Sequence, residues 1–108
     1  MPSEISSGKT TKDQKPLGNW VTRAVVDVGV EPDGRTQLPS HACSEARVTA
    51  HASNTQPIYI GSNTVSSTNT VPTTAKNGEQ IDRLLDSNTI YVVAAAGHTG
   101  QKLYLQTR

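Results

Sequence analysis

The residues of this sequence that could do chemistry are three histidines and one cysteine, and their spacing does not assemble a site. His41, His51 and His98 are expected in a turn, on the polar face of a strand and in a loop. No pair has the i, i+4 helical spacing of a metal site. Cys43 with His41 or His51 could pair a thiol nucleophile with a base, but no third orienting group accompanies them. We therefore expect no enzyme activity, no metal and no cofactor.

The acidic residues and the glycines indicate surface features and turns. Glu79 and Asp82, like Asp82 and Asp86, are spaced as solvated charges. The turn from Glu31 to Gly34 lacks the alternating oxygen ligands and the distal Glu of a calcium loop. The eight glycines are scattered, so no glycine-rich loop is present to hold a phosphate.

The composition predicts one small domain with little core. The chain has 108 residues, of which 33% are hydrophobic and none is Phe. A chain of this size buries only roughly 65% of its unfolded surface, so we expect an oligomer that enlarges the core. Lys and Arg number 10 against 9 Asp and Glu, without a basic run. Nucleic acid is therefore not an expected partner, and no stretch approaches the roughly 20 apolar residues of a membrane span.

The stretch around which the chain is organised is residues 88–106, which we expect to be a β-hairpin with its loop at 97–100. Two faces alternate along its first strand: Ile90, Val92, Ala94 and Ala96 on one, and Tyr91, Val93 and Ala95 on the other. Because both faces are apolar, both need to be covered. The cover is either a second sheet of the same domain or another subunit.

Other segments also alternate with the period of a β-strand. Strands are expected at 21–30, 42–52 and 57–60, with a second hairpin turn after Gly61. A strand end followed by a single helical turn is expected in residues 79–86. The predicted fold class is all-β: a small antiparallel β-sandwich or barrel of about six to eight short strands, in one domain spanning residues 20–108 and preceded by an extended arm.

The N-terminal residues 1–19 cannot form a core, because Ile5 and Leu17 are their only sizeable aliphatic residues. They are either a frayed tail or an extended arm that lies along a neighbouring subunit, with Pro16 favouring extended backbone. Trp20, at the junction, is either a lid on the core or an interface anchor.

Three runs of residues resemble a small β module of tailed-phage virion proteins: ARVTAHASNTQPIYIGSNTVSSTNT, KNGEQI and LDSNTIYVVAAAGHTGQKLYL. The similarity covers roughly residues 42–105. The sequence departs from the module at Pro57, where Gly or Thr is usual, and at Asn69-Thr70, where Asn-Gly is usual.

This resemblance implies a structural virion protein that is made in the host cytoplasm and decorates or cements the capsid. The implied partners are further copies of the chain, as a homotrimer, and the major capsid protein or other virion proteins. The expected contact residues are Ile5, Leu17, Trp20, Tyr91, Val93 and Ala95. The alternatives are a tail, baseplate or head-fibre component, and a carbohydrate-binding adhesion module that uses the neutral polar loops of residues 53–78.

Overall fold

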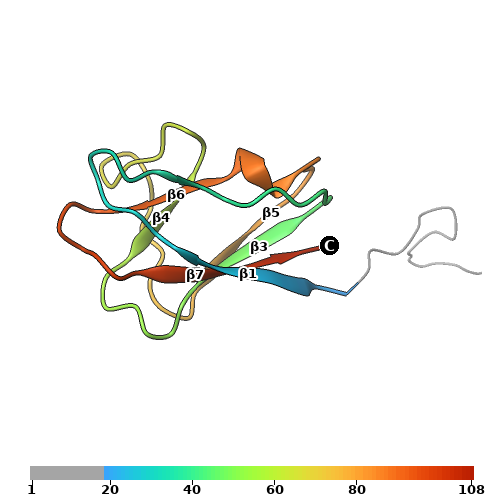
Figure 1. Ribbon diagram of the computed structural model, residues 1–108, viewed down its shortest axis with the longest axis horizontal. Coiled ribbons are helices and arrows are strands. Elements are labelled where there is room, and N and C mark those ends of the chain that lie inside the picture. The colour runs from blue at the N-terminus through green and yellow to red at the C-terminus, as the bar shows by residue number, and fades with distance from the viewer. Residues whose placement is uncertain (1–18) are drawn as a thin grey trace, which may run out of the picture.

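The computed structural model describes residues 19–108, which fold into two antiparallel β-sheets packed face to face (Figure 1). The four-stranded sheet has the order β1 (Val21–Asp27), β7 (Lys102–Thr107), β3 (Ala46–Ala50), β5 (Gly78–Ile81), and the three-stranded sheet the order β2 (Thr36–Gln37), β6 (Tyr91–Ala94), β4 (Ile58–Gly61). Within residues 19–108 there is a single helical turn, the 3-10 helix η1 (Ser87–Thr89). The predicted all-β sandwich is confirmed. The predicted arm and two of its contact residues, Ile5 and Leu17, lie outside the described residues.

The core forms where the inner faces of the two sheets meet, and strand alternation selects its members. In β3, Ala46, Val48 and Ala50 are buried while Arg47 and Thr49 lie on the outer face. The buried cluster consists of Val28, Leu38, Ala46, Val48, Ala50, Ile58, Ile60, Ile90, Val92, Ala94, Leu103 and Leu105. Its members are aliphatic and several are alanines, as expected for a core of small volume.

The predicted hairpin of residues 88–106 is wrong, because its two strands lie in different sheets. β6 pairs with β2 and β4, whereas β7 pairs with β1 and β3, so every edge of both strands is already paired. Residues 95–101 form the crossing between the sheets, with Gly97 and Gly100 at φ of 83° and 85°. Positive φ is accessible to glycine without strain, which permits the change of direction.

The second predicted hairpin, after Gly61, is also absent from residues 19–108. The segment 62–73 instead leaves β4 and crosses the outer face of the three-stranded sheet. Its Val65 carbonyl accepts a hydrogen bond from Arg35 Nε at 2.7 Å, and the Ser67 N–H donates to Glu31 Oε2 at 3.1 Å. Arg35 and Glu31 precede β2 at the opposite edge of that sheet, so the segment spans it.

The predicted helical turn lies later in the chain than expected. Residues 82–86 contain no helix, and η1 forms at Ser87–Thr89. Asp86 caps it, since Asp86 Oδ1 accepts the Asn88 N–H at 2.9 Å. No helix among residues 19–108 has the length and apolar character needed to cross a membrane.

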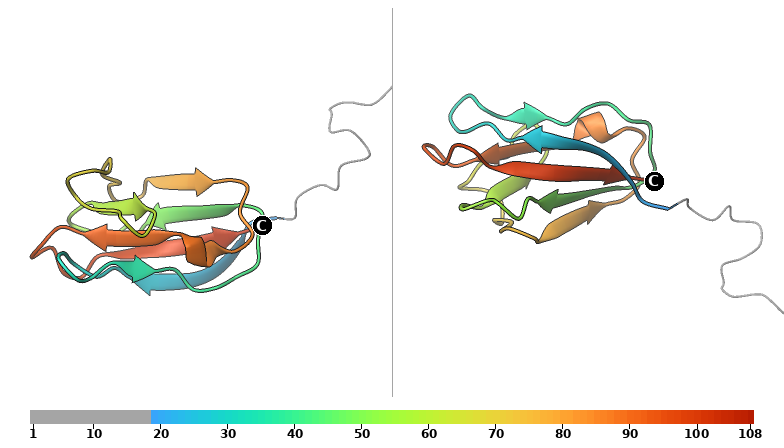
Figure 2. Two further views of the ribbon diagram at one scale, coloured as in Figure 1. Left: turned by 90° about the horizontal axis from the view of Figure 1, so that it is seen from above. Right: turned by 60° about the horizontal axis from the view of Figure 1, so that its bottom comes forward.

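The chain connects the two sheets on both lateral sides of the sandwich. On one side, the chain continues from β1 into the three-stranded sheet: Val28 N–H donates to Gln101 O at 2.9 Å, and Val30 bridges to Ala94. Figure 2 shows β1 and β2 together on this side and β5 and β4 on the other. On that other side, residues 73–77 run from Thr73, which bridges to Ile58 of β4, to the start of β5, so the chain connects the two sheets there as well.

Candidate interaction site

Among the histidines and the cysteine, the His51 side chain makes defined structural contacts, whereas His98 Nδ1 is buried without a hydrogen-bond partner in the described part of the chain. His51 Nδ1 accepts the Ser53 N–H at 3.0 Å, and the His51 ring stacks on Tyr104 with 4.8 Å between ring centroids. Burial, with a contribution from the Asp86 charge, raises the pKa of the Cys43 thiol, which keeps it protonated near neutral pH. Within residues 19–108, no three His, Cys, Asp or Glu side chains are grouped to hold a metal.

Two guanidinium groups contact the ring of Trp20 at the end of the four-stranded sheet where residue 19 begins. The guanidinium carbon of Arg47 is 4.4 Å from the centre of its ring, and that of Arg108 is 4.3 Å away. Arg47 Nε donates to Gln106 Oε1 at 3.0 Å, and Arg108 Nε donates to Glu45 Oε1 at 2.7 Å. We call these five side chains the Trp20 clamp.

The Trp20 clamp holds the chain where residues 1–19 meet the sandwich. Cation–π contacts at partly exposed sites contribute about 0.5–1 kcal/mol each, and the two acceptors fix the guanidinium planes. Arg47 and Arg108 alternate with the buried Ala46 and Thr107, so the clamp lies on the outer face of the sheet. The prediction of Trp20 as a lid on the core is therefore wrong. Its alternative, an interface anchor, stays a prediction.

The predicted contact face of Tyr91, Val93 and Ala95 lies on the outer side of the three-stranded sheet. Val93 is 0% exposed within a single chain, while Tyr91 and Ala95 are half-buried. The segment 62–73 supplies the cover, with Val65 itself buried. The prediction of Val93 as a subunit contact is wrong, because the chain's own loop occupies that face. Val65, the one aliphatic residue among residues 61–70, was the sequence signal for this cover.

An apolar cleft of about 250 Å³ opens on the side between β4 and β5. Its lining is formed by Ile60, Gly61, Ser62, Glu79, Ile81, Leu84, Thr89 and Ile90. Glu79 lies opposite the buried Val48 in the sheet register, so its side chain is on the inner face, at a position where a core residue would be expected. Sequence reasoning missed this cleft, although Glu79 and Ile81 are two residues apart and therefore share a face.

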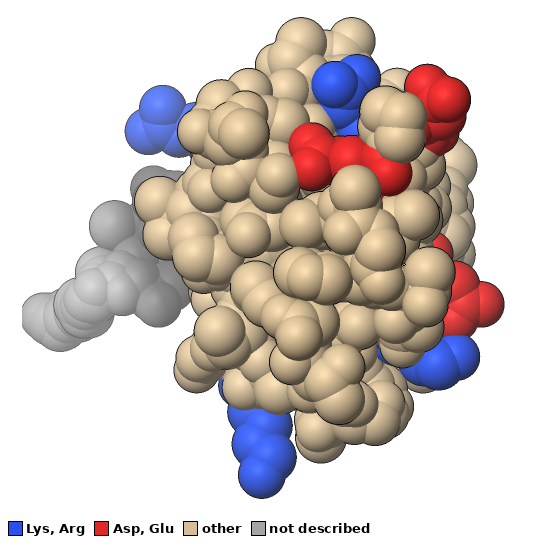
Figure 3. All heavy atoms as spheres, turned by 90° about the vertical axis from the view of Figure 1, so that its left-hand side faces the viewer, with Lys and Arg blue, Asp and Glu red and all other residues tan. Residues whose placement is uncertain are grey.

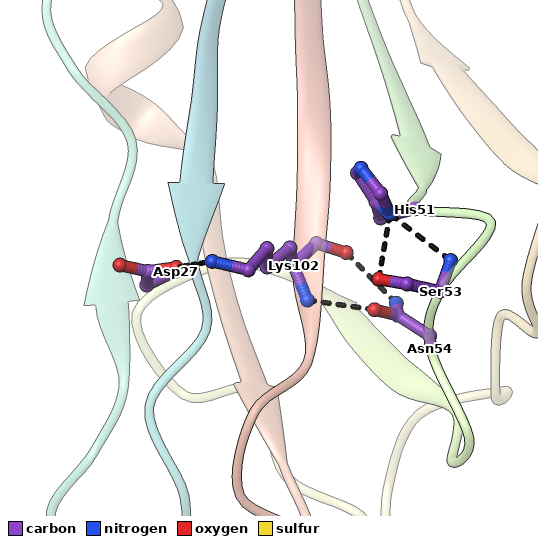
Figure 4. Close-up of polar contacts among 5 residues, drawn as sticks. All are labelled: Asp27, His51, Ser53, Asn54 and Lys102. Carbon is purple, nitrogen blue, oxygen red and sulfur yellow. Dashed lines mark hydrogen bonds and ion pairs between the residues drawn. The ribbon is translucent and has the colours of Figure 1, made fainter.

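Two long loops at the end of the sandwich opposite residue 19 are uncharged. Figure 3 shows mostly neutral side chains on this face, with acidic and basic groups in its upper part and along its edges. Residues 53–75 and 95–101, which contribute loops here, contain no Asp, Glu, Lys or Arg. These loops are held by side-chain bonds: Asn54 Nδ2 donates to Lys102 O and Asn54 Oδ1 accepts the Lys102 N–H, both at 2.8 Å (Figure 4). Lys102 Nζ in turn pairs with Asp27 at 2.8 Å.

Comparisons of this chain with protein-family models, with curated proteins and with solved structures find no match. Three features of the chain itself bear on its function: the Trp20 clamp, the cleft between β4 and β5, and the uncharged loops of residues 53–75 and 95–101.

Proposed function

We propose that this protein is a structural virion protein of a tailed phage, which decorates or cements the capsid surface and attaches to it through residues 1–19. The observation that carries the proposal is the Trp20 clamp. It fixes the point at which the attachment segment joins the sandwich, through two guanidinium contacts at 4.4 and 4.3 Å.

A fixed junction matters because an attachment segment acts through effective concentration. When one part of the segment is bound, the folded domain stays within reach of its second contact, and the overall affinity rises without new contacts. A junction that slid or unfolded would weaken this coupling. Arg108, the last residue of the chain, and Arg47 in β3 hold Trp20 against two central strands of the four-stranded sheet.

The two ends of the sandwich then have different roles. Residue 19 leaves at one end, and the uncharged loops lie at the other (Figures 1 and 3). In a decoration protein the first end faces the shell and the second faces solvent. A tail, baseplate or head-fibre component would use the same arrangement on a different partner.

A carbohydrate-binding adhesion module is the second candidate, and the uncharged loops favour it. Exposed hydroxyl and amide side chains such as those of Thr55 and Gln56 hydrogen-bond to neutral ligands without the desolvation penalty of a charge. The aromatic residues support it less well. Trp20 has guanidinium groups against its ring, and Tyr104 is stacked on His51.

The test is to co-express the chain with the products of its neighbouring genes and to separate assembled shells on a density gradient. We expect the full chain to sediment with shells, and a chain lacking residues 1–18 to stay at the top. Trp20→Ala should reduce binding, whereas Tyr104→Ala, a substitution on the same sheet face outside the clamp, should not. Failure of the full chain to sediment with any shell would refute the proposal, and selective retention on a glycan array would favour the second candidate.

A further inference from the structure

The strand β5 presents a free edge in the described part of the chain, where it pairs with β3 alone. The Ala50 N–H donates to Asn77 O at 2.8 Å. Hydrogen-bonded pairs alternate along an antiparallel ladder, so Glu79 and Ile81 also bond to β3. The N–H and C=O groups of Gly78 and Gln80 therefore point away from β3, where a further strand could bond to them.

The cleft lies directly beside this free edge. Ile81 and Leu84 line it from the β5 side, and Ile60 and Ile90 from the three-stranded sheet. Its volume of about 250 Å³ exceeds the roughly 150 Å³ of an apolar cavity that accommodates benzene, so an aliphatic side chain fits. Glu79 adds a carboxylate at the same site. A strand added to β5 would thus meet a carboxylate and an apolar recess two residues apart on one face.

We propose that this edge and cleft bind Lys15 and Leu17 of a second copy of the chain, added as a strand parallel to β5. This inference rests on the proposed function, in which residues 1–19 are the attachment arm, and it names the partner as a second copy. Lys15 and Leu17 are two residues apart and share a face. In this register Lys15 lies opposite Glu79 and Leu17 lies opposite Ile81. The ammonium group of Lys15 then meets the Glu79 carboxylate, and the Leu17 side chain enters the cleft.

Proline at position 16 is compatible with this register. In a pair of parallel strands, a residue of one strand that bonds to the other does so through both its N–H and its C=O. Its two partners are the residues on either side of the one directly opposite it. Lys15, opposite Glu79, would bond to Gly78 O and to the Gln80 N–H. The nitrogen of Pro16, which carries no hydrogen, would then face away from β5, and proline is tolerated at such edge positions.

The donor has to be a second copy, because Leu17 cannot reach the cleft of its own chain in this register. Val21, Thr107, Ala46 and Ile81 form one row across the four-stranded sheet. Neighbouring strands are about 4.8 Å apart, so a strand added beyond Ile81 lies about 19 Å from Val21. The four residue steps from Leu17 to Val21 span at most about 14 Å.

The first test is a disulfide cross-link. In a Cys43→Ser background, Leu17→Cys is combined with Leu84→Cys, which lies in the cleft, and the protein is oxidised with oxidised glutathione. We expect covalent dimers and larger species on a non-reducing gel. The matched control places the second cysteine at Leu85, which is 91% exposed, and should cross-link weakly. Cross-links within one chain, or equal yields from both pairs, would overturn the inference.

The second test measures self-association by light scattering over a range of concentrations. Leu17→Ser should weaken it about tenfold or more, the effect of removing one buried leucine. Lys15→Glu and Glu79→Lys should each weaken it, and the double swap should restore it, whereas Lys12→Glu should have no effect. Circular dichroism confirms that each variant is folded. A wild-type chain that stays monomeric at all concentrations would contradict the inference.

These tests use the purified chain without any shell, so their result is separable from that of the proposed function. Self-association without shell binding would support the strand addition and refute the capsid role. Shell binding by a chain that neither cross-links nor self-associates would support the capsid role and refute the strand addition.

Discussion

Replacement of Gln101 by leucine should be the most damaging single polar substitution at the loop end. Gln101 is only 2% exposed, and its side chain joins two loops. Its Oε1 accepts the N–H groups of Thr55 and Gln56 at 3.0 and 3.2 Å. Its Nε2 donates to Thr99 O at 2.9 Å and to His98 O at 3.4 Å. Leucine fills a similar volume but makes none of these bonds.

The expected loss follows from these four distances. An ordinary hydrogen bond contributes about 1 kcal/mol net, and the longest of the four contributes little. Three bonds give about 3 kcal/mol, and the range is about 2–4 kcal/mol because water reaches part of the exposed Thr55 and Gln56 backbone. For a domain of this size a loss of about 3 kcal/mol lowers the melting temperature by about 12–24 °C.

The measurement is urea unfolding followed by circular dichroism, with Gln106→Leu as the matched control. Gln106 also makes two side-chain bonds, to Arg47 at 3.0 Å and to Thr22 at 3.3 Å, but on the outer face of the sheet. We expect the control to lose less than about 1 kcal/mol. If Gln101→Leu loses no more than the control, the loops are not held together by this side chain.

Three further predictions concern other contacts. Hydrogen bonds from Ser67 lower the pKa of the Glu31 carboxyl. The stability that they add is therefore present above the pKa of Glu31 in the unfolded chain and is lost as the pH falls through its pKa in the folded chain. Glu31→Gln should flatten this acid dependence of unfolding. Gly78→Ala should lose about 1–3 kcal/mol in thermal unfolding, because the added Cβ would lie 2.7 Å from Val48 O. Val93→Ala should lose about 2–3 kcal/mol yet leave the oligomeric mass in light scattering unchanged.

The sequence was a good guide to which residues face the core. The alternation of small apolar and polar residues in 46–50 and 102–107 corresponds to β3 and β7 with the predicted inner faces. This works because the side-chain period of a strand is a local property that follows from backbone geometry. The inward alanines of β3 likewise indicated a core of small volume.

Strand pairing was not predictable from the same pattern. Alternation in residues 90–94 and 102–107 is equally compatible with two strands of one hairpin and with two strands in facing sheets. Hydrogen-bonding partners decide between them, and those of β6 come from β2 and β4, which lie far away in the sequence. The seven residues between β6 and β7 exceed the two to five of a tight hairpin loop, and this length argues against a hairpin.

The Trp20 clamp, like the strand pairing, could not be predicted from the pattern of residues within one segment. Trp20, Arg47 and Arg108 are brought together by the registers of β1, β7 and β3, which place the ends of three strands side by side. Each residue looked ordinary in its own segment. The cleft was hidden for a related reason, since a pattern shows that Glu79 and Ile81 share a face but not that a cleft lies between them and the facing sheet.

Glu79 illustrates how one residue can both protect the free edge of β5 and make it selective. A free sheet edge beside an apolar recess is an aggregation hazard, and an inward-pointing charge is a device that natural sheets use against it. An aliphatic residue at position 79 would add to the core, but it would leave the edge open to any apolar strand. The carboxylate disfavours such partners, because pairing would desolvate it without compensation. A strand that brings a cation two residues before an aliphatic side chain escapes this penalty, so the same group that blocks unspecific pairing favours Lys15 and Leu17.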